Sequence, residues 1–187
     1  VAIRVALAPG DVADPPGWIG GLDRRVGIVP GGENRAESVR RAIRALPQDV
    51  GVIMVHDAAR PLVDRGMVDR CLAEARAGRG AVTGWRATDT LKEVDGRLRV
   101  VGTPDRRRIW HAQTPQAFPA DLIRRAYEDL ADPAAATDDA SVVEAVGGTV
   151  VMVEGSPRNL KVTRPEDVAL AELLLRTVRG DRTARGS

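Results

Sequence analysis

The chain has 187 residues, of which 43% are hydrophobic and 29% charged, and this suits one folded domain with a sizeable core. Its net charge of +2 and its 3% aromatic content argue against a nucleic-acid-binding protein, which needs a basic surface and rings for base stacking. No apolar run approaches the length that spans a membrane. The single cysteine, Cys71, excludes an internal disulfide framework and is typical of a reducing compartment. We therefore expect a cytoplasmic protein without nucleic-acid or membrane partners.

Strand-like and helix-like segments alternate along the chain, which predicts a Rossmann-like α/β fold with a mainly parallel sheet and helices on both faces. We expect strands at residues 1–7, 26–29, 50–55, 81–85, 149–153 and 159–162. We expect helices at residues 34–46, 67–77, 121–130, 138–146 and from Pro165 to about Val178. The Pro/Gly-rich segment from Pro9 to Gly21 is expected to be a loop.

Capping residues define where three of these helices begin. Asn34 is followed three residues later by Glu37, and Thr137 or Asp138 precedes the helix that ends at Gly147-Gly148. The run Thr163-Arg164-Pro165-Glu166 matches a capping box at the start of the last helix.

Residues 1–178 are expected to form a single domain. Thr90 to Val101 should form a hairpin of two short strands around Asp95-Gly96, a dipeptide typical of tight hairpin turns. Residues 179–187 are polar, and we expect them to form a disordered tail.

The continuous apolar run Val50–Val55 predicts a central strand buried on both faces. It ends directly at His56-Asp57-Ala58-Ala59-Arg60-Pro61. Ligands of open α/β sheets bind outside the carboxyl ends of strands, so this segment is the first candidate for an anion-binding site. The alternative is a local ion pair between Asp57 and Arg60 with no ligand.

Lysine is rare in this chain, because Lys92 and Lys161 are the only lysines among its 28 basic residues. An ammonium group is a compact point charge that suits a phosphate oxygen, whereas guanidinium is a planar fork. Both lysines are therefore candidates for anion binding, although chance retention on the surface is the alternative for each.

Further stretches are rich in side chains that bind anions or hydroxyl groups. They are Gly31-Gly32-Glu33-Asn34-Arg35 with Ser38, Asp89-Thr90-Leu91-Lys92, Arg106 through Thr114-Pro115-Gln116, and Asn159-Leu160-Lys161-Val162-Thr163. Each has a structural alternative: a strand-to-helix turn, a solvated charge run or a helix cap. Walker A, Gly-x-Gly-x-x-Gly, His-Glu-x-x-His and Gly-x-Ser-x-Gly motifs are absent from the sequence.

Taken together and in this order, the stretches resemble the 2-C-methyl-D-erythritol 4-phosphate cytidylyltransferases of the non-mevalonate isoprenoid pathway. The resemblance runs from about Val26 to Leu175. Its strongest pieces are Val55-His56-Asp57-Ala58-Ala59-Arg60-Pro61, Ala112-Gln113-Thr114-Pro115-Gln116, Thr137-Asp138-Asp139-Ala140-Ser141 and Asn159-Leu160-Lys161-Val162-Thr163. The family is a group of nucleotidyltransferases that join CTP to a sugar-alcohol phosphate and release pyrophosphate.

The resemblance implies a role for residues on the nucleotide side. Cytosine recognition would fall to the following group: Gly31, Gly32, Glu33 and Ser38. Ala58 would lie near the ribose, and Lys161 would be the catalytic residue, binding phosphate near the α-phosphate of CTP. The family often has Asp where this chain has Glu33.

On the side of the sugar phosphate, the resemblance implies these contacts: Asp57, Arg60, Thr90, Arg106 and Thr114. The family's hairpin arm, about residues 87–108 here, embraces a second subunit. The resemblance thus implies a homodimer in which Thr90 and Arg106 act in the neighbour's site. It also implies Mg²⁺ as a cofactor, and Asp57 is the candidate ligand.

The family opens with a strand and a glycine-rich loop carrying an Arg and a Lys that wrap the triphosphate, and nothing before Val26 resembles this opening. We therefore expect the chain to be N-terminally incomplete and to bind CTP poorly by itself. Two other readings stay open: a ribitol-5-phosphate cytidylyltransferase, and a non-catalytic relative of the fold.

Overall fold

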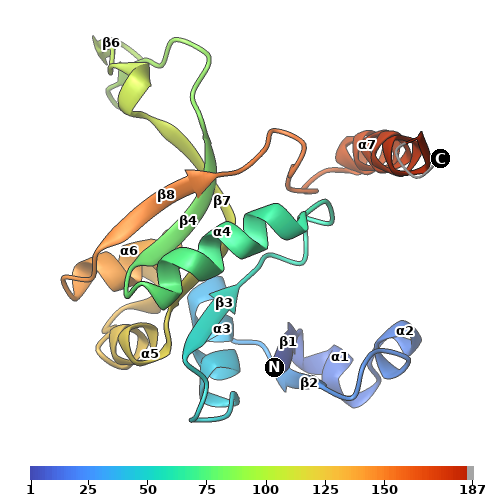
Figure 1. Ribbon diagram of the computed structural model, residues 1–187. Helices are drawn as coiled ribbons and strands as arrows, with labels where there is room; N and C mark the ends of the chain where they lie inside the picture. The colour runs from blue at the N-terminus through green and yellow to red at the C-terminus, as the bar shows by residue number, and fades with distance from the viewer. Residues whose placement is uncertain (185–187) are drawn as a thin grey trace. The chain divides into compact units, whose positions relative to one another are not determined.

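The computed structural model describes residues 1–184, and its mixture of helices and strands confirms the α/β class (Figure 1). The chain folds as two compact units. The first unit comprises Val1–Val55, Leu72–Ala81 and Gln116–Val151. The second comprises His56–Cys71, Val82–Pro115 and the described residues from Met152 onward. The single domain expected over residues 1–178 stays a prediction.

In the first unit, β1 (Ile3–Leu7) and β2 (Val26–Pro30) pair in parallel along their whole length. The chain between them is not the plain loop that we expected, because it contains the short helices α1 (Pro9–Ala13) and α2 (Gly17–Gly20). Pro9 occupies the first turn of α1, where its fixed φ suits a helix and its missing N–H costs no hydrogen bond.

Helix α3 (Arg35–Arg44) follows β2 and begins where the sequence predicts. The side chain of Asn34 accepts a hydrogen bond of 2.9 Å from the backbone N–H of Glu37, which confirms Asn34 as the N-cap. Ala36 and Ile43 are buried and mark the apolar face of the helix.

A four-stranded sheet has the strand order β3-β7-β4-β8. Its members are β3 (Val52–Val55), β4 (Gly80–Arg86), β7 (Trp110–Pro119) and β8 (Val150–Glu154). Strand β3 pairs antiparallel with β7. We did not predict β7, because the polar run Gln113–Gln116 includes a proline and resembles a turn.

The remaining helices agree with the predicted segments. The α-helices concerned are α4 (Arg65–Arg76), α5 (Ala120–Glu128) and α6 (Asp139–Ala145). Two short 3₁₀ helices, η1 (Arg106–Arg108) and η2 (Pro133–Ala135), were not predicted. Asp138, rather than Thr137, caps α6 and forms a capping box with Ser141.

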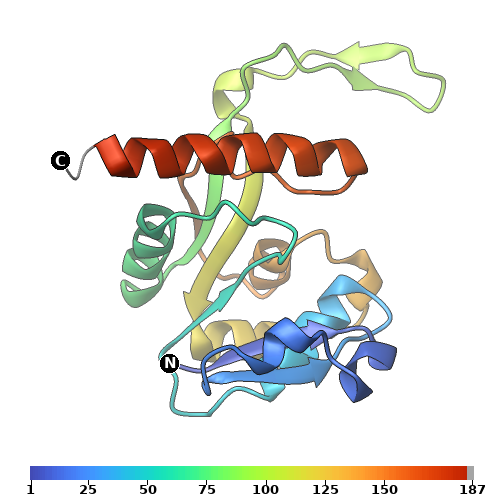
Figure 2. The same cartoon turned by 90° about the vertical axis from the view of Figure 1, so that its right-hand side faces the viewer.

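In the second unit, β5 (Glu93–Val94) and β6 (Val100–Gly102) form the expected hairpin, which extends away from the ends of β4 and β7 (Figure 2). Its turn is wider than Asp95-Gly96 alone. The backbone N–H of Asp95 donates to the carbonyl of Arg99 at 3.0 Å, and Leu98 takes a left-handed φ of 60°.

Helix α7 (Pro165–Ala184) continues past Val178, where we expected it to end. Arginine is a good helix former and one glycine costs only ~1 kcal/mol, so the polar sequence after Val178 is compatible with helix. The predicted tail covers residues 179–187, of which 185–187 lie outside the described residues.

The cap of α7 is shifted by one residue from the predicted box. The Asp167 carboxylate accepts hydrogen bonds from the backbone N–H groups of Thr163 and Arg164, at 2.8 and 2.9 Å. Asp167 therefore takes the part expected of Glu166, because Arg164 precedes the first helical residue and Asp167 is the third residue of the helix.

The segment 159–162 was predicted to be a strand, and this prediction is wrong. The N–H of Asn159 bonds to the carbonyl of Ser156 at 3.0 Å, which makes a turn instead. Val162 gives its N–H to the carbonyl of Ala59 at 2.7 Å. This bond links the segment to the loop after β3 rather than to a β-ladder.

Each unit has buried apolar side chains, among them Phe118, Ile123 and Tyr127 in the first and Met67, Cys71 and Val82 in the second. The Cys71 sulfur lies 3.1 Å from the hydroxyl oxygen of Thr83, and burial raises the pKa of the thiol. Cys71 is therefore a buried small hydrophobe in this fold. From residue 1 to residue 184, no helix is both long and apolar enough to cross a membrane.

Candidate functional site

The loop between β2 and α3 has its main chain held by hydrogen bonds. The N–H of Gly31 bonds to the carbonyl of Leu7 at 2.7 Å, and the N–H of Gly32 bonds to the Ser38 hydroxyl at 2.9 Å. That hydroxyl in turn donates to the carbonyl of Asn34 at 2.9 Å. Three of the predicted nucleotide-binding residues, Gly31, Gly32 and Ser38, therefore form one rigid turn.

Glycine is required at both loop positions by the close approach of neighbouring atoms. A Cβ on Gly31 would lie 2.9 Å from the carbonyl oxygen of Leu7, and a Cβ on Gly32 would overlap Cβ and Cγ of Glu37. Arg41 adds a hydrogen bond of 2.8 Å to the carbonyl of Gly31. The side chain of Glu33, by contrast, is exposed at the tip of the loop.

In the second unit, the structure brings two predicted residues from distant parts of the sequence into contact. The Lys161 ammonium lies 3.0 Å from a carboxylate oxygen of Asp57. Asp57 is mostly buried, at 15% side-chain exposure, whereas Lys161 is 43% exposed and can reach a ligand from solvent. The carboxylate thus orients a cation at the surface of this unit.

Thr114 joins Asp57 to the same cluster. Its hydroxyl oxygen accepts a 2.9 Å hydrogen bond from the backbone N–H of Asp57 and lies 3.1 Å from Nδ1 of His56. The other ring nitrogen of His56 lies 3.0 Å from the carbonyl oxygen of Arg60. The loop from His56 to Arg60 is therefore fixed at both ends by side chains of β7 and of the loop itself.

Arg60 is held between the loop and the segment that precedes Lys161. Its guanidinium donates a 2.8 Å hydrogen bond to the carbonyl of Asn159. Burial lowers the pKa of Arg60, and the charge of Asp57 opposes that effect. Arginine nevertheless stays cationic, because its ordinary pKa is so high. Arg60 is therefore a fixed positive charge beside the Asp57–Lys161 pair.

Asn159 is fully buried and connects several members of the cluster. Its side-chain amide donates to the backbone carbonyl of Thr114 at 2.9 Å. The backbone carbonyl of Asn159 accepts hydrogen bonds from the side chains of Gln113 and Arg60. Asn159, Gln113 and His56 were not assigned roles from sequence. The signal for Asn159 and Gln113 would have to be their burial, which a single sequence does not show, whereas His56 is exposed.

The other predicted residues of the second unit are exposed. Ala58 lies on the loop after β3, while Thr90 and Arg106 lie near the base of the hairpin. The Arg106 guanidinium donates to the carbonyl of Thr88 at 2.7 Å. In the described part of the chain, no hydrogen bond or ion pair is found that joins Thr90 or Arg106 to the Asp57–Lys161 pair.

The donor set does not make a metal site by itself. Among residues 1–184, no group of three or more His, Cys, Asp or Glu side chains is placed to hold a metal ion. Asp57, the predicted ligand, contributes one carboxylate, and that carboxylate already contacts Lys161. The described residues therefore form no preassembled cluster of ligands for a divalent ion.

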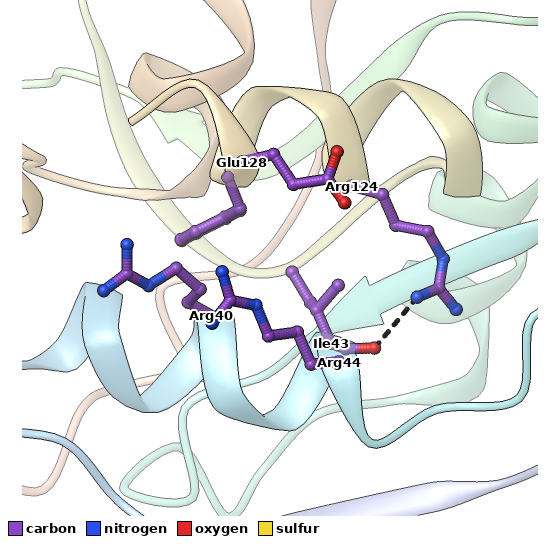
Figure 3. A pocket seen from close by; sticks show the side chains of 6 residues that line it. Arg40, Ile43, Arg44, Arg124 and Glu128 are labelled. Carbon is purple, nitrogen blue, oxygen red and sulfur yellow. Dashed lines mark hydrogen bonds between the residues drawn. The ribbon is translucent and has the colours of Figure 1, made fainter. Parts of the chain in front are cut away.

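A pocket between α3 and α5 lies outside all the predicted site residues (Figure 3). Its lining consists of Arg40, Ile43, Arg44, Arg124, Tyr127 and Glu128. Arg124 crosses from α5 and donates to the carbonyls of Ile43 and Pro47, at 3.1 and 2.8 Å. These bonds satisfy one carbonyl in the last turn of α3 and one in the segment that follows it, so the pocket is a feature of the packing of α5 on α3.

Comparison with known proteins identifies relatives over nearly the whole chain. A profile of the family described as 2-C-methyl-D-erythritol 4-phosphate cytidylyltransferase matches residues 3–177. A relative of that name from Aeromonas hydrophila is 46% identical over 178 residues, which are 92% of this chain and 70% of the relative. Another, from Frankia casuarinae, is 44% identical over 171 residues, which are 88% of this chain and 63% of the relative.

Solved structures give the same result. A 4-diphosphocytidyl-2C-methyl-D-erythritol synthase from Anaerococcus prevotii matches with a TM-score of 0.85 and 28% identity, over 94% of this chain and 78% of that one. A 2-C-methyl-D-erythritol 4-phosphate cytidylyltransferase from Thermus thermophilus matches with a TM-score of 0.78 and 35% identity, over 94% and 82%. The curated relatives above are longer, and this chain spans between 63% and 70% of their length.

Proposed function

The chain belongs to the 2-C-methyl-D-erythritol 4-phosphate cytidylyltransferase family, and on that premise we propose that it transfers a cytidylyl group from CTP to 2-C-methyl-D-erythritol 4-phosphate. Pyrophosphate is the second product. The observation that carries this proposal is the cluster of Lys161, Asp57, Arg60 and Thr114, which places cations and hydroxyl-binding groups together at the end of β3.

The reaction needs positive charge and alignment rather than a general base. A phosphate monoester has a second pKa of about 6, so the attacking oxygen is already largely dianionic at neutral pH. Attack on the α-phosphate of CTP brings two anions together and builds charge on the leaving pyrophosphate. Cations fixed beside the phosphates offset that charge without reorganising during the reaction.

Each residue of the cluster has a part in this scheme. Lys161 binds phosphate oxygens, and Asp57 orients Lys161 and accepts hydrogen bonds from sugar hydroxyls. Arg60 and Thr114 complete the contacts to the sugar phosphate. The pair at 3.0 Å supports these roles, because a carboxylate beside the ammonium holds it in one direction before substrate arrives.

The nucleotide side consists of the turn formed by Gly31, Gly32 and Ser38, with Glu33 at its tip. Glycines let a base approach the main chain closely, and the exposed Glu33 offers acceptors for the amino group of cytosine. Ala58 lies on the loop that also carries Asp57, and we place it beside the ribose.

Mg²⁺ enters this scheme with the nucleotide rather than as a resident ion. Magnesium commonly keeps several waters and binds through one or two carboxylates plus substrate phosphates. A single carboxylate already paired with Lys161 does not make a site. Bound to CTP, the ion would supply further positive charge at the phosphates.

A competition assay tests the substrate. The complete gene product is incubated with CTP, Mg²⁺ and equal amounts of methylerythritol phosphate and ribitol 5-phosphate, and both cytidylylated products are quantified. We expect the methylerythritol product to dominate, because the family match and the relatives carry that name. Turnover of ribitol phosphate alone would overturn the assignment, and no turnover of either would favour a non-catalytic relative.

We also propose that the hairpin arm, residues 87–108, acts in a second subunit of a homodimer. Arg106 and Thr90 are exposed at the base of the hairpin, and Val94, Leu98, Val100 and Val101 expose apolar surface along it. Exposed apolar patches of this kind favour protein contacts. Arg106 would then bind the sugar phosphate of the neighbouring site.

Mixing two impaired variants, at a sugar-phosphate concentration where each alone shows little turnover, tests this arrangement. Arg106→Ala should raise KM for the sugar phosphate more than KM for CTP, because its guanidinium suits a phosphate. If Arg106 acts in the neighbour, an equal mixture with Lys161→Ala subunits should recover about one quarter of the wild-type activity, since half the dimers then contain one intact site. Activity that never exceeds the weighted mean of the two variants would place Arg106 in its own subunit's site.

The compartment that we propose is the cytoplasm, where a charged, phosphorylated substrate and CTP are both present. The chain has one cysteine, the buried Cys71, and this low cysteine content supports a reducing compartment.

A further inference from the structure

The motif Thr137-Asp138-Asp139-Ala140-Ser141 takes no part in the chemistry proposed above, yet it contains the fully buried carboxylate of Asp139. One oxygen of Asp139 accepts a 2.6 Å hydrogen bond from the hydroxyl of Tyr127 on α5. The other oxygen lies 2.7 Å from the guanidinium of Arg35, at the start of α3. A buried charge persists only when it is paired and hydrogen-bonded, and both conditions are met.

Neighbouring residues fix the carboxylate in place. Asp138 caps α6 through the N–H of Ser141 at 2.9 Å, and its second oxygen accepts from Gln116 of β7 at 2.9 Å. The other end of the Gln116 amide accepts from the N–H of Ala140 at 3.0 Å. Asp139 is therefore rigidly attached to β7, α5 and α6 within the first unit.

Arg35 connects Asp139 to the turn formed by Gly31 and Gly32. It is the first residue of α3, directly after the cap Asn34, and the turn of Gly31 and Gly32 is bonded to the same helical turn through Ser38. A movement of the N-terminus of α3 would therefore move the glycine turn as well. The Arg35 side chain is 36% exposed, and its ion pair with the fully buried Asp139 helps to set its direction.

We propose that Asp139 is a positioning residue for the nucleotide, acting through Arg35 to set where the Gly31-Gly32 main chain lies when the cytosine binds. This inference rests on the proposed function, in which that turn recognises the base. Asp139 touches neither substrate, so its removal should affect CTP binding without changing recognition of the sugar phosphate. Tyr127 supports the carboxylate, and burial together with Asp139 raises the pKa of its phenol, which keeps the hydroxyl a donor.

Asp139→Asn is the most specific change. The side-chain oxygen of asparagine can still accept a hydrogen bond from Tyr127. Its NH₂ group then faces the Arg35 guanidinium, and because both groups are donors they cannot bond to each other. We expect KM for CTP to rise about threefold to thirtyfold, the range found for residues that act through another. We expect KM for the sugar phosphate and kcat at saturating CTP to stay within about twofold.

A second readout does not depend on catalysis. Hydrogen–deuterium exchange of a peptide covering residues 31–38 should become faster in Asp139→Asn, because the Gly32 N–H to Ser38 bond loses its fixed support. Arg35→Gln should reproduce both effects. Glutamine keeps an N–H donor for the buried Asp139 carboxylate, so this variant keeps that group hydrogen-bonded while it removes the positive charge.

Ile123→Val is the matched control for stability. Ile123 is fully buried on α5 in the same unit and lies outside the hydrogen-bond network of Asp139. Loss of one methylene from the core leaves a small cavity and should lower Tm modestly. KM for CTP should not change in this variant.

The possible outcomes distinguish a failure of the proposed function from a failure of the positioning role of Asp139. If the wild-type protein makes no cytidylyl product, the proposed function fails, whatever the variants do. If the wild type is active but Asp139→Asn and Arg35→Gln both leave KM for CTP and the exchange of residues 31–38 unchanged, the positioning role is wrong. An equal rise in both KM values, shared by Ile123→Val, would show that Asp139 contributes only to stability.

Discussion

Replacing Lys161 with alanine should lower kcat by about two to three orders of magnitude, the effect of removing one group that stabilises developing charge. The ammonium is the cation that lies 3.0 Å from Asp57, and in the proposed function it binds the phosphates. The reaction brings two anions together, so loss of this charge raises the barrier more than it weakens binding. Single-turnover kinetics with saturating substrates would measure the chemical step directly.

Stability should change little in the same variant. Lys161 is 43% exposed and its partner 15%, and ion pairs near the surface contribute about 0–1 kcal/mol. A thermal unfolding curve close to that of the wild type would therefore accompany the loss of turnover. A large drop in Tm would instead mean that the lysine is mainly structural.

Lys92 provides the matched control, because it is the only other lysine of the chain. It lies on the hairpin, where its ammonium donates to the Thr103 hydroxyl at 2.8 Å. Lys92→Ala removes the same charge and the same side chain from an exposed position. Near-normal rates in Lys161→Ala, or equal losses in the two variants, would contradict the assigned role.

The sequence predicted most of the regular elements, because periodicity and capping residues are local signals. Strand β3 follows from the apolar run Val50–Val55, and α3 from the cap Asn34 with Glu37. The main omission is β7, where Gln113 and Gln116 lie in the middle of a strand. Both are buried because each side chain has hydrogen-bond partners contributed by residues distant in the sequence. Such partners cannot be identified from local pattern.

The reverse error occurs at residues 159–162. Leu160 and Val162 resemble a strand, but Asn159 turns inward and bonds to Thr114 and Gln113. This turn places Lys161 beside Asp57. Through the family resemblance, the sequence thus indicated two residues that the structure brings into contact. The reason they meet is a buried asparagine, and its burial depends on tertiary structure.

Arg60→Ala is expected to raise KM for the sugar phosphate by about 100-fold, because truncating one member of a partly buried charged cluster removes both its charge and the order of its neighbours. The guanidinium donates to the carbonyl of Asn159 at 2.8 Å, and that carbonyl lies two residues before Lys161. Loss of the donor should also cost about 1–2 kcal/mol of stability through a weakened hydrogen bond in a mostly dry environment.

Arg60→Lys distinguishes charge from shape. Lysine restores the positive charge but not the planar fork that bonds a carbonyl and a phosphate at once. KM for the sugar phosphate should therefore recover only in part, while KM for CTP stays near the wild-type value in both variants. Arg65→Ala, five positions along the chain, is the control, since Arg65 is 92% exposed and pairs with Asp69 at 3.5 Å. Two results would contradict a directed contact between Arg60 and the sugar phosphate. They are a rise in KM for CTP instead in Arg60→Ala, and complete recovery of activity in Arg60→Lys. Either result would mean that Arg60 acts only through its positive charge.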